Sequence, residues 1–364
     1  MLNNENGNRT TLILTCIFSF LIIAIIGLFV ANNGGNKTKK EVKAPRQQVD
    51  QVRYSIKDNV NVVISKDNNV EVNDILNNKI NLPAGFKISN DSPLTVEEGI
   101  VVEDENGNQF VWIPVGKIIT KDDEEKEIKI GRYDFKLDSP VQTAENVTDE
   151  SIIFNGYYEY DKNDNTLTNN SKAKDIADFV DSATFYGGYY LARYEAGVEA
   201  SNHNSALNEK INASKVKPLS KAKQCVWNSI TQVNAANACK NMYSNNNFDS
   251  DLVNSYAWDT AIRFIMISND KVTTKSKAST TLSKTAEAAY TNGNKDVLCN
   301  IYDMIGNVRE WTTESYKEGT NVSAPAVARG IDFNTTGGDI TLRSVAGANQ
   351  ELDNVGFRPI IYLK

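Results

Sequence analysis

An uncharged, strongly apolar run near the N-terminus constrains the fold of this chain more than any other feature. No charged residue occurs from Thr10 to Gly35, and Leu12 to Ala31 is almost wholly apolar. That length is about the 20 residues that an α-helix needs to cross a bilayer. We therefore predict a short N-terminal tail at residues 1–9, a transmembrane helix at residues 10–31 and a water-exposed remainder.

A cleaved signal peptide is the competing interpretation, but this run is longer than an ordinary signal core and lacks a clear small-x-small cleavage site. The flank before the run carries only Arg9, whereas the flank after it carries Lys37, Lys39, Lys40, Lys43 and Arg46. Taken literally, the positive-inside rule leaves the large domain in the cytoplasm. A single N-terminal anchor with a polar tether is instead typical of bacterial surface display. We expect a single-pass membrane protein with its large domain extracellular, and the orientation stays open.

The charge and the histidine content exclude several classes of function. A net charge of -7 and a pI near 5.1 give no basic footprint for nucleic acid. His203 is the only histidine, and it lies in the polar run SNHNSALNEK, which is typical of a solvated loop. A site with two histidines on iron cannot form, since imidazole is the usual ligand there.

The remaining chain divides by composition. Residues 32–50 are polar and aperiodic and predict a flexible tether. Residues 51–98 alternate Val and Ile with Asn and Asp, which predicts a small β-rich cap or linker region. Residues 99–364 form the main domain, with a charged insertion at about 117–174 that we expect to be a solvated hairpin or long loop.

Local patterns predict four elements of the main domain. Asn106-Gly107 between two β-rich runs predicts that Ile100–Asp104 and Gln109–Val115 pair as a hairpin. The aromatic run Ala183–Gly197 indicates a buried strand near the domain centre. Apolar positions at helical spacing predict helices at Ile230–Tyr243 and Ser255–Ile267.

Four cysteines are too few for a disulfide scaffold, and Cys16 lies inside the apolar run. The spacing of Cys225, Cys239 and Cys299 is not of the CxxC type, so it favours metal ligation only weakly. A disulfide among the three stays open. Buried, unreactive thiols are the expected state.

The segment from Cys299 to Trp311 carries the most specific motif. Asp303 and Glu310 bracket a Gly306-Asn307 turn, so the two carboxylates and the intervening carbonyls can face inward. Such hard oxygen ligands suit calcium. A plain surface turn followed by a core tryptophan is the alternative, because Asp and Asn often occupy turns without binding anything.

Several motifs occur together in the order found in one family. The chain resembles the formylglycine-generating enzyme (sulfatase-modifying factor) superfamily over about residues 99–364. The resemblance implies an α+β fold, an irregular C-type-lectin-like domain with few helices and short twisted strands. The motifs are Phe110–Val115, Tyr189–Glu195, Val226-Trp227, a helix holding Cys239, Trp258 in a second helix, Asp303–Trp311, Arg329-Gly330 and Gly356–Arg358.

Carried over residue by residue, the resemblance implies a calcium site at Asp303, Gly306, Val308 and Glu310. The family commonly has Trp where Arg309 stands, which we expect to alter a surface contact. Arg358 resembles a structural arginine, a planar donor suited to carbonyls and carboxylates.

The catalytic part of the resemblance does not carry over. Copper-dependent members use a cysteine pair before the terminal GFR motif, and Ala328–Val355 contains no cysteine. Iron-dependent relatives need several histidines. We therefore expect neither copper nor iron, and we assign no catalytic residue.

The expected function is non-catalytic binding of an unknown protein or glycan ligand by a membrane-anchored surface protein. Some relatives are variable proteins of diversity-generating retroelements, with a diversified segment between the motifs at Gly330 and Gly356. A divergent enzyme using Cys225, Cys239 or Cys299, and a structural envelope or pilus component, stay open as alternatives. The candidate ligand-binding residues are Asp332, Asn334, Thr335, Asp339, Thr341 and Asn349.

Overall fold

The computed structural model divides the chain into two units, Met1–Arg46 and Gln47–Lys364. It describes residues 50–56, 65–135, 141–143, 152–153, 157–161, 166–170, 176–199, 215–273, 291, 297–316, 326–335, 340–347 and 349–364. The predicted tail, transmembrane helix and most of the tether (residues 1–49) lie outside these residues, as does His203. None of the helices that the structure describes is both long and apolar enough to cross a membrane.

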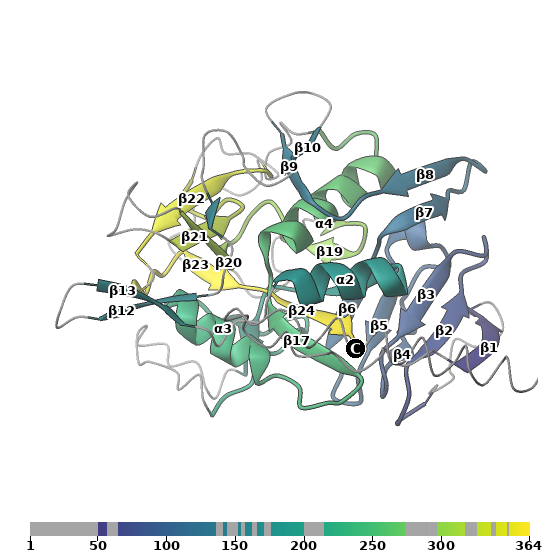
Figure 1. The fold of residues 1–364 in the computed structure, drawn as a ribbon, viewed down its shortest axis with the longest axis horizontal. Helices are drawn as coiled ribbons and strands as arrows, with labels where there is room; N and C mark the ends of the chain where they lie inside the picture. Colours follow the sequence, from purple (N-terminus) through teal and green to yellow (C-terminus); the bar gives the residue numbers. More distant parts are fainter. Residues whose placement is uncertain are drawn as a thin grey trace, which may run out of the picture. The chain divides into compact units, whose positions relative to one another are not determined.

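A six-stranded antiparallel sheet forms the centre of the second unit (Figure 1). All residues of β14 and β24, two of its four inner strands, are buried, which is the signature of a sheet covered on both faces. In spatial order its strands are β17 (Phe248–Leu252), β24 (Pro359–Leu363), β14 (Gly188–Ala192), β6 (Gln109–Pro114), β5 (Val101–Glu103) and β4 (Lys87–Ile88).

Two neighbouring tyrosines of β14 show what covers each face, because adjacent side chains of a strand point to opposite sides. The Tyr189 hydroxyl donates to the Ala257 carbonyl, and its ring meets Phe179 edge-on. The Tyr190 hydroxyl donates to the Asn81 carbonyl at 3.0 Å. Helices α2 and α4 therefore lie on one face, and Asn81 at β3 lies on the other.

The described part of the unit contains three α-helices: α2 (Ile176–Tyr186), α3 (Gln232–Lys240) and α4 (Ser255–Ser268), with a 3-10 turn η2 (Val96–Glu98). Side-chain caps begin α3 and α4, since Thr231 accepts from the Asn234 N–H and Asn254 from the Ala257 N–H. The helices predicted at Ile230–Tyr243 and Ser255–Ile267 are thus confirmed.

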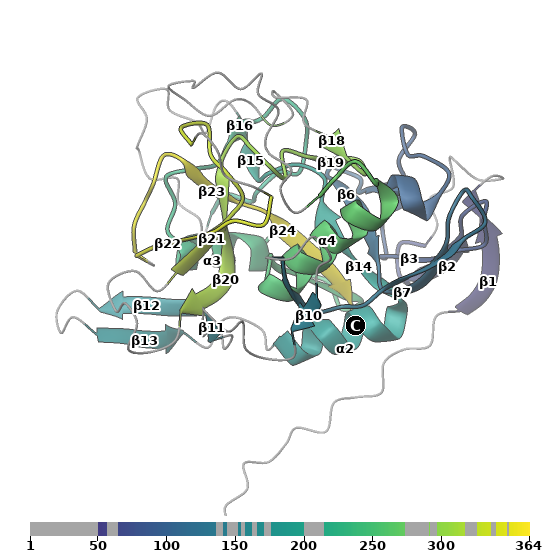
Figure 2. The same cartoon turned by 90° about the horizontal axis from the view of Figure 1, so that it is seen from above.

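A second, smaller sheet carries the motifs of the C-terminal half. It lies at the opposite end of the unit from β1–β3 in both views (Figures 1 and 2). β20 runs antiparallel to β21 and parallel to β23, so the two ends of the candidate ligand-binding segment enter one sheet. Its strands are β11 (Ile152–Ile153), β20 (Arg309–Tyr316), β21 (Ala326–Arg329), β22 (Arg343–Ala346) and β23 (Val355–Phe357).

The other strands form small ribbons. These are β1 (Asp50–Ser55), β2 (Val70–Asn73) and β3 (Lys79–Leu82), then β7 (Gly116–Ile119) with β8 (Glu125–Ile128), β9 (Arg132–Asp134) with β10 (Val141–Thr143), β12 (Tyr157–Asp161) with β13 (Thr166–Asn170), β15 (Gly197–Val198) with β16 (Cys225–Val226), and β18 (Val297–Leu298) with β19 (Ile301–Tyr302). The insertion expected at about 117–174 begins with the β7–β8 hairpin, but it is not wholly solvated, because Ile118, Ile128 and Tyr133 are buried in the core.

The same five-residue turn closes two hairpins. In one, the N–H and side-chain amide of Asn78 donate to Asp74 at 2.8 and 2.9 Å. In the other, those groups of Asn108 donate to Asp104 at 2.7 and 2.8 Å. Each asparagine oxygen then accepts a backbone N–H from elsewhere in the fold. The second turn confirms the hairpin predicted from Asn106-Gly107.

Two expectations change in detail. The aromatic run from Ala183 was predicted as strand throughout, but Ala183–Tyr186 is the last turn of α2 and the central strand starts at Gly188. The described part of region 51–98 packs into the main core, where Ile80, Leu82 and Phe86 belong to the same hydrophobic cluster as side chains of the central sheet. The motifs at Phe110–Val115 and Trp258 therefore share one hydrophobic core with this N-terminal region, whereas Trp227, Trp311 and Phe357 belong to a second cluster.

Candidate functional site

The DMIGNVREW segment is a tight loop followed by β20. Asp303 and Asn307 have φ angles of 57° and 67°, a left-handed conformation that Asp and Asn tolerate better than most residues. All residues from Asp303 to Val308 are buried, so this is an internal loop and not a surface turn. The alternative of a plain surface turn is therefore wrong, because the turn is buried.

The loop closes around a carboxylate that sequence reasoning missed. Glu195, at the end of the β14 motif, is 0% exposed. Its Oε1 accepts from the Val308 N–H at 3.1 Å, and its Oε2 accepts from the Asn307 side-chain amide at 2.5 Å. The Gly-Asn turn thus directs two donors at an acid that follows β14, far away in the sequence.

The two family motifs meet in a buried ion pair. The Nε of Arg358 lies 2.9 and 3.0 Å from the two carboxylate oxygens of Glu310, and its Nη2 lies 2.6 Å from Oε1. The guanidinium also donates to the carbonyls of Ala192 and Tyr302 at 2.9 and 2.8 Å. This planar fork joins β14, β19 and β20. Arg358 is structural, as the resemblance implied.

The charges in this cluster do not balance. Glu195, Asp303 and Glu310 are carboxyl groups, and Arg358 is their shared cation. Burial, then the charges of Asp303 and Glu310, raise the pKa of Glu195 well above its ordinary value. Burial also raises the pKa of Glu310, although Arg358 opposes it. The cluster therefore favours a proton or a further cation.

These residues suit calcium by the chemistry of their donors, which are all oxygen. Asp303 and Glu310 would supply carboxylates, and Gly306 and Val308 backbone carbonyls. Within the described residues, no three His, Cys, Asp or Glu side chains group so as to hold a metal, and the expected ligand set therefore depends on the two carbonyls. Because Arg358 already binds Glu310, calcium would share that carboxylate.

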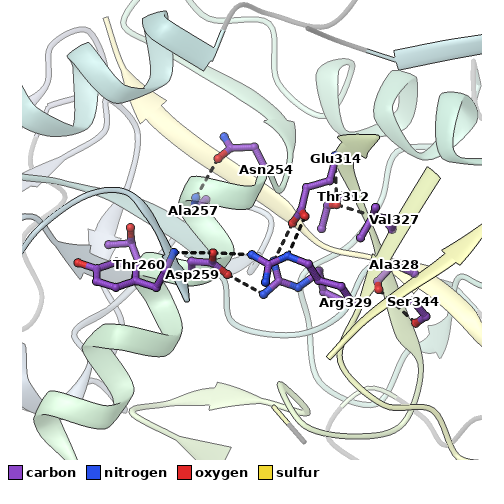
Figure 3. Close-up of polar contacts among 12 residues, drawn as sticks. Asn254, Ala257, Asp259, Thr260, Thr312, Glu314, Val327, Ala328, Arg329 and Ser344 are labelled. Atoms are coloured by element: carbon purple, nitrogen blue, oxygen red, sulfur yellow. Dashed lines mark hydrogen bonds and ion pairs between the residues drawn. The ribbon is translucent and has the colours of Figure 1, made fainter. Parts of the chain in front are cut away.

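A second buried charge network joins α4 to the smaller sheet. Arg329 lies between Asp259 and Glu314, with nitrogen–oxygen distances of 2.6 and 2.7 Å (Figure 3). Arg343 reaches the same two acids at 2.7 and 3.1 Å. Although burial opposes it, the two arginines hold the pKa of Asp259 below its ordinary value. We call these four residues the charge quartet; it fixes β21 and β22 on α4.

The candidate ligand-binding residues differ in exposure. Asn334, Thr335 and Asn349 are exposed, and Thr341 is half-buried. Asp332 is only 4% exposed. Asp339 lies outside the described residues.

Comparison with protein families identifies one matching domain. The model for the sulfatase-modifying factor enzyme 1-like domain matches residues 100–362. The chain belongs to this family. The match covers the central sheet except β4, and it also covers the Glu195 cluster and the charge quartet; β2, β3 and β4 precede it. The comparison with curated proteins found no match.

The family match does not by itself supply a catalytic centre. Cys225, Cys239 and Cys299 are free thiols. They lie on β16, on α3 and in the turn before β19, all outside the segment between Arg329 and Arg358. Burial raises the pKa of each thiol, for Cys299 to about 12.

Proposed function

We propose that this chain is a membrane-anchored, non-catalytic surface protein whose sulfatase-modifying-factor-like domain binds a protein or glycan ligand through residues 330–356. One observation carries the proposal: polar loops with exposed side chains are held between strands that are themselves fixed. Arg329 precedes the segment and Arg358 follows it, and both are fully buried in ion pairs. Asn334, Thr335 and Asn349 project between these anchors.

This arrangement suits recognition more than chemistry. Amide and hydroxyl groups form adaptable hydrogen bonds, and a rigid frame lowers the entropy that binding must offset. Buried thiols are poor metal ligands, because the thiolate is the species that binds. Nothing in the geometry of the described cysteines favours the divergent-enzyme alternative.

The test compares two triple variants of the full-length chain. Asn334→Ala/Thr335→Ala/Asn349→Ala removes the exposed polar groups of the proposed face. The matched control, Asn90→Ala/Asn106→Ala/Thr184→Ala, removes the same residue types at exposed positions elsewhere. Both are assayed on a glycan array and on a panel of purified surface proteins. Binding that the face variant loses and the control keeps supports the proposal.

If both triple variants bind every glycan or protein that the wild type binds equally well, the proposed face is not the binding site. A thiol-dependent consumption of oxygen, with copper bound stoichiometrically, would replace the proposal with the enzyme alternative. Partners that survive the face variant would favour a structural envelope component.

The location and the diversified version are separate parts of the proposal. We expect the large domain to be extracellular, so protease treatment of intact cells should cleave it. A diversity-generating retroelement requires a template repeat and a reverse transcriptase near the gene. Their absence from the sequenced locus removes that version and leaves ligand binding intact.

A further inference from the structure

Asp332 occupies a different position from the other candidate ligand contacts. It is 4% exposed, whereas Asn334 and Thr335, its near neighbours, are exposed. A carboxylate at that depth needs partners inside the protein. Its contacts show that it has them on both oxygens.

One carboxylate oxygen organises the loop that contains Asp332. Oδ1 accepts from the Asn334 N–H at 2.9 Å and from the Thr335 hydroxyl at 2.8 Å. The Thr335 N–H also donates to the Asp332 carbonyl at 3.1 Å. These bonds fix the backbone of residues 332–335, which we call the first loop.

The other oxygen reaches a separate part of the chain. Oδ2 accepts from the Asn354 side-chain amide at 2.8 Å. Asn354 ends the segment 349–354, which we call the second loop and which contains the exposed Asn349. A single buried carboxylate therefore joins the two loops of the proposed face.

Arg309 supplies the charge that balances this carboxylate. Its Nε lies 2.8 Å from Asp332 Oδ2. The approach does not meet the angle of a hydrogen bond, so charge attraction carries it. The Arg309 N–H also donates to the Asn354 carbonyl at 3.0 Å. The side chain and the backbone N–H of Arg309 thus both make contacts where the second loop joins β20.

We propose that Asp332 is a positioning residue: with Arg309 it fixes the first loop against the second, so that Asn334, Thr335 and Asn349 present one recognition surface. This rests on the proposed function for the surface's role, but the geometry of the loops is independent of any ligand. Asp332 itself is not a ligand contact.

The test uses four variants of the full-length chain. Asp332→Asn removes the charge and keeps the shape, and Arg309→Met removes the cation and keeps the stem. Arg309→Lys is the conservative replacement. Asp353→Asn is the matched control, because it neutralises an exposed acid of the second loop.

Two measurements read the position of the loops without the natural ligand. The first is hydrogen exchange of peptides covering 332–335 and 352–354. The second is affinity for an antibody fragment selected on the wild type and shown, by loss on Asn334→Ala and on Asn349→Ala, to touch both loops. For Asp332→Asn and Arg309→Met we expect loop exchange to rise and affinity to fall, each by at least about tenfold.

Arg309→Lys should restore affinity to within about threefold of wild type, since it returns the charge without the fork. Asp353→Asn and the central-sheet peptides should stay unchanged. The proposal is overturned if Asp332→Asn and Arg309→Met both exchange their loop hydrogens at the wild-type rate. It is also overturned if both variants bind the antibody fragment with wild-type affinity. If Asp332→Asn does not fold, the comparison of Arg309→Met with Arg309→Lys tests the proposal. Failure to find any natural ligand affects the proposed function alone.

Discussion

Glu314→Gln tests how far the charge quartet holds the smaller sheet on α4. Asp259, Glu314 and Arg329 have fully buried side chains, and that of Arg343 is 9% exposed. The quartet has two acids and two guanidiniums, so this substitution leaves one positive charge uncompensated. Breaking a buried pair in this way costs about 3–5 kcal/mol.

The entropy of unfolding is about 2.1 cal/mol/K per residue, so for a chain of this size 1 kcal/mol corresponds to roughly 1.5 °C and the melting temperature should fall by about 4–8 °C. Thermal unfolding by near-ultraviolet circular dichroism measures it. The exposed pair of Lys117 and Glu125 provides the control, because Glu125→Gln should change stability by less than about 1 kcal/mol.

A double-mutant cycle separates charge balance from packing. Glu314→Gln/Arg343→Met restores neutrality, so its loss of stability should be smaller than the sum of the two single losses, by about 1–3 kcal/mol. Strict additivity, or a Glu314→Gln protein within about 1 kcal/mol of wild type, would refute the reasoning.

Three further predictions concern packing and thiols. Asn108→Ala should cost about 1–3 kcal/mol in urea unfolding, because it removes a partner from two buried polar groups; exposed Asn106→Ala should be near neutral. Gly188→Ala should prevent folding, read by expression and circular dichroism, since its Cβ would lie 2.4 Å from a tryptophan ring; Gly85→Ala, with φ 83° and open space, should cost only about 1 kcal/mol. In native protein a thiol reagent should label the half-buried Cys225 and leave a fully buried thiol such as that on α3 unlabelled until unfolding.

The elements that were predictable are those whose signal is local. Asn106-Gly107 specifies its hairpin because only certain residues accept the turn's backbone angles. The error at Ala183–Tyr186 has the same origin. Phe179, Ala183 and Tyr186 form one buried helical face, but that pattern begins before the aromatic run and was hidden by its β-rich composition.

The site was predictable only in part, because its partners are distant in sequence. The Gly-Asn turn marks the loop, yet the acid that it encloses lies 112 positions from Asn307. Glu195 did leave one signal, as a charged residue at the end of a buried aromatic run. Asp332 left none, since an Asp before Asn and Thr is equally typical of a ligand contact and of a buried link.

The Glu195 cluster gives the calcium site predicted from the sequence a signature in the pH dependence of stability. Without calcium, the folded state favours protonated Glu195, because its pKa is raised by burial and by Asp303 and Glu310. A carboxyl with a raised folded pKa stabilises fully below its unfolded pKa, and that stability is lost as the pH rises through the folded value. In chelator, the wild type should therefore lose stability from acid to neutral pH and beyond, and Glu195→Gln should flatten the loss.

Calcium should act in the opposite direction, since a cation offsets the negative charge that deprotonation exposes. Its stabilisation follows mass action and should be largest at high pH. Asp303→Ala should abolish that gain, and the double variant with Glu310→Ala should also lower stability in chelator by stranding Arg358. Identical melting temperatures for the wild type in calcium and in chelator at pH 8 would show that the cluster does not bind calcium. If the stability of the wild type and that of Glu195→Gln change with pH in parallel in chelator, protonation of Glu195 does not balance the cluster. The proton and calcium, the two cations that could balance it, are therefore tested separately.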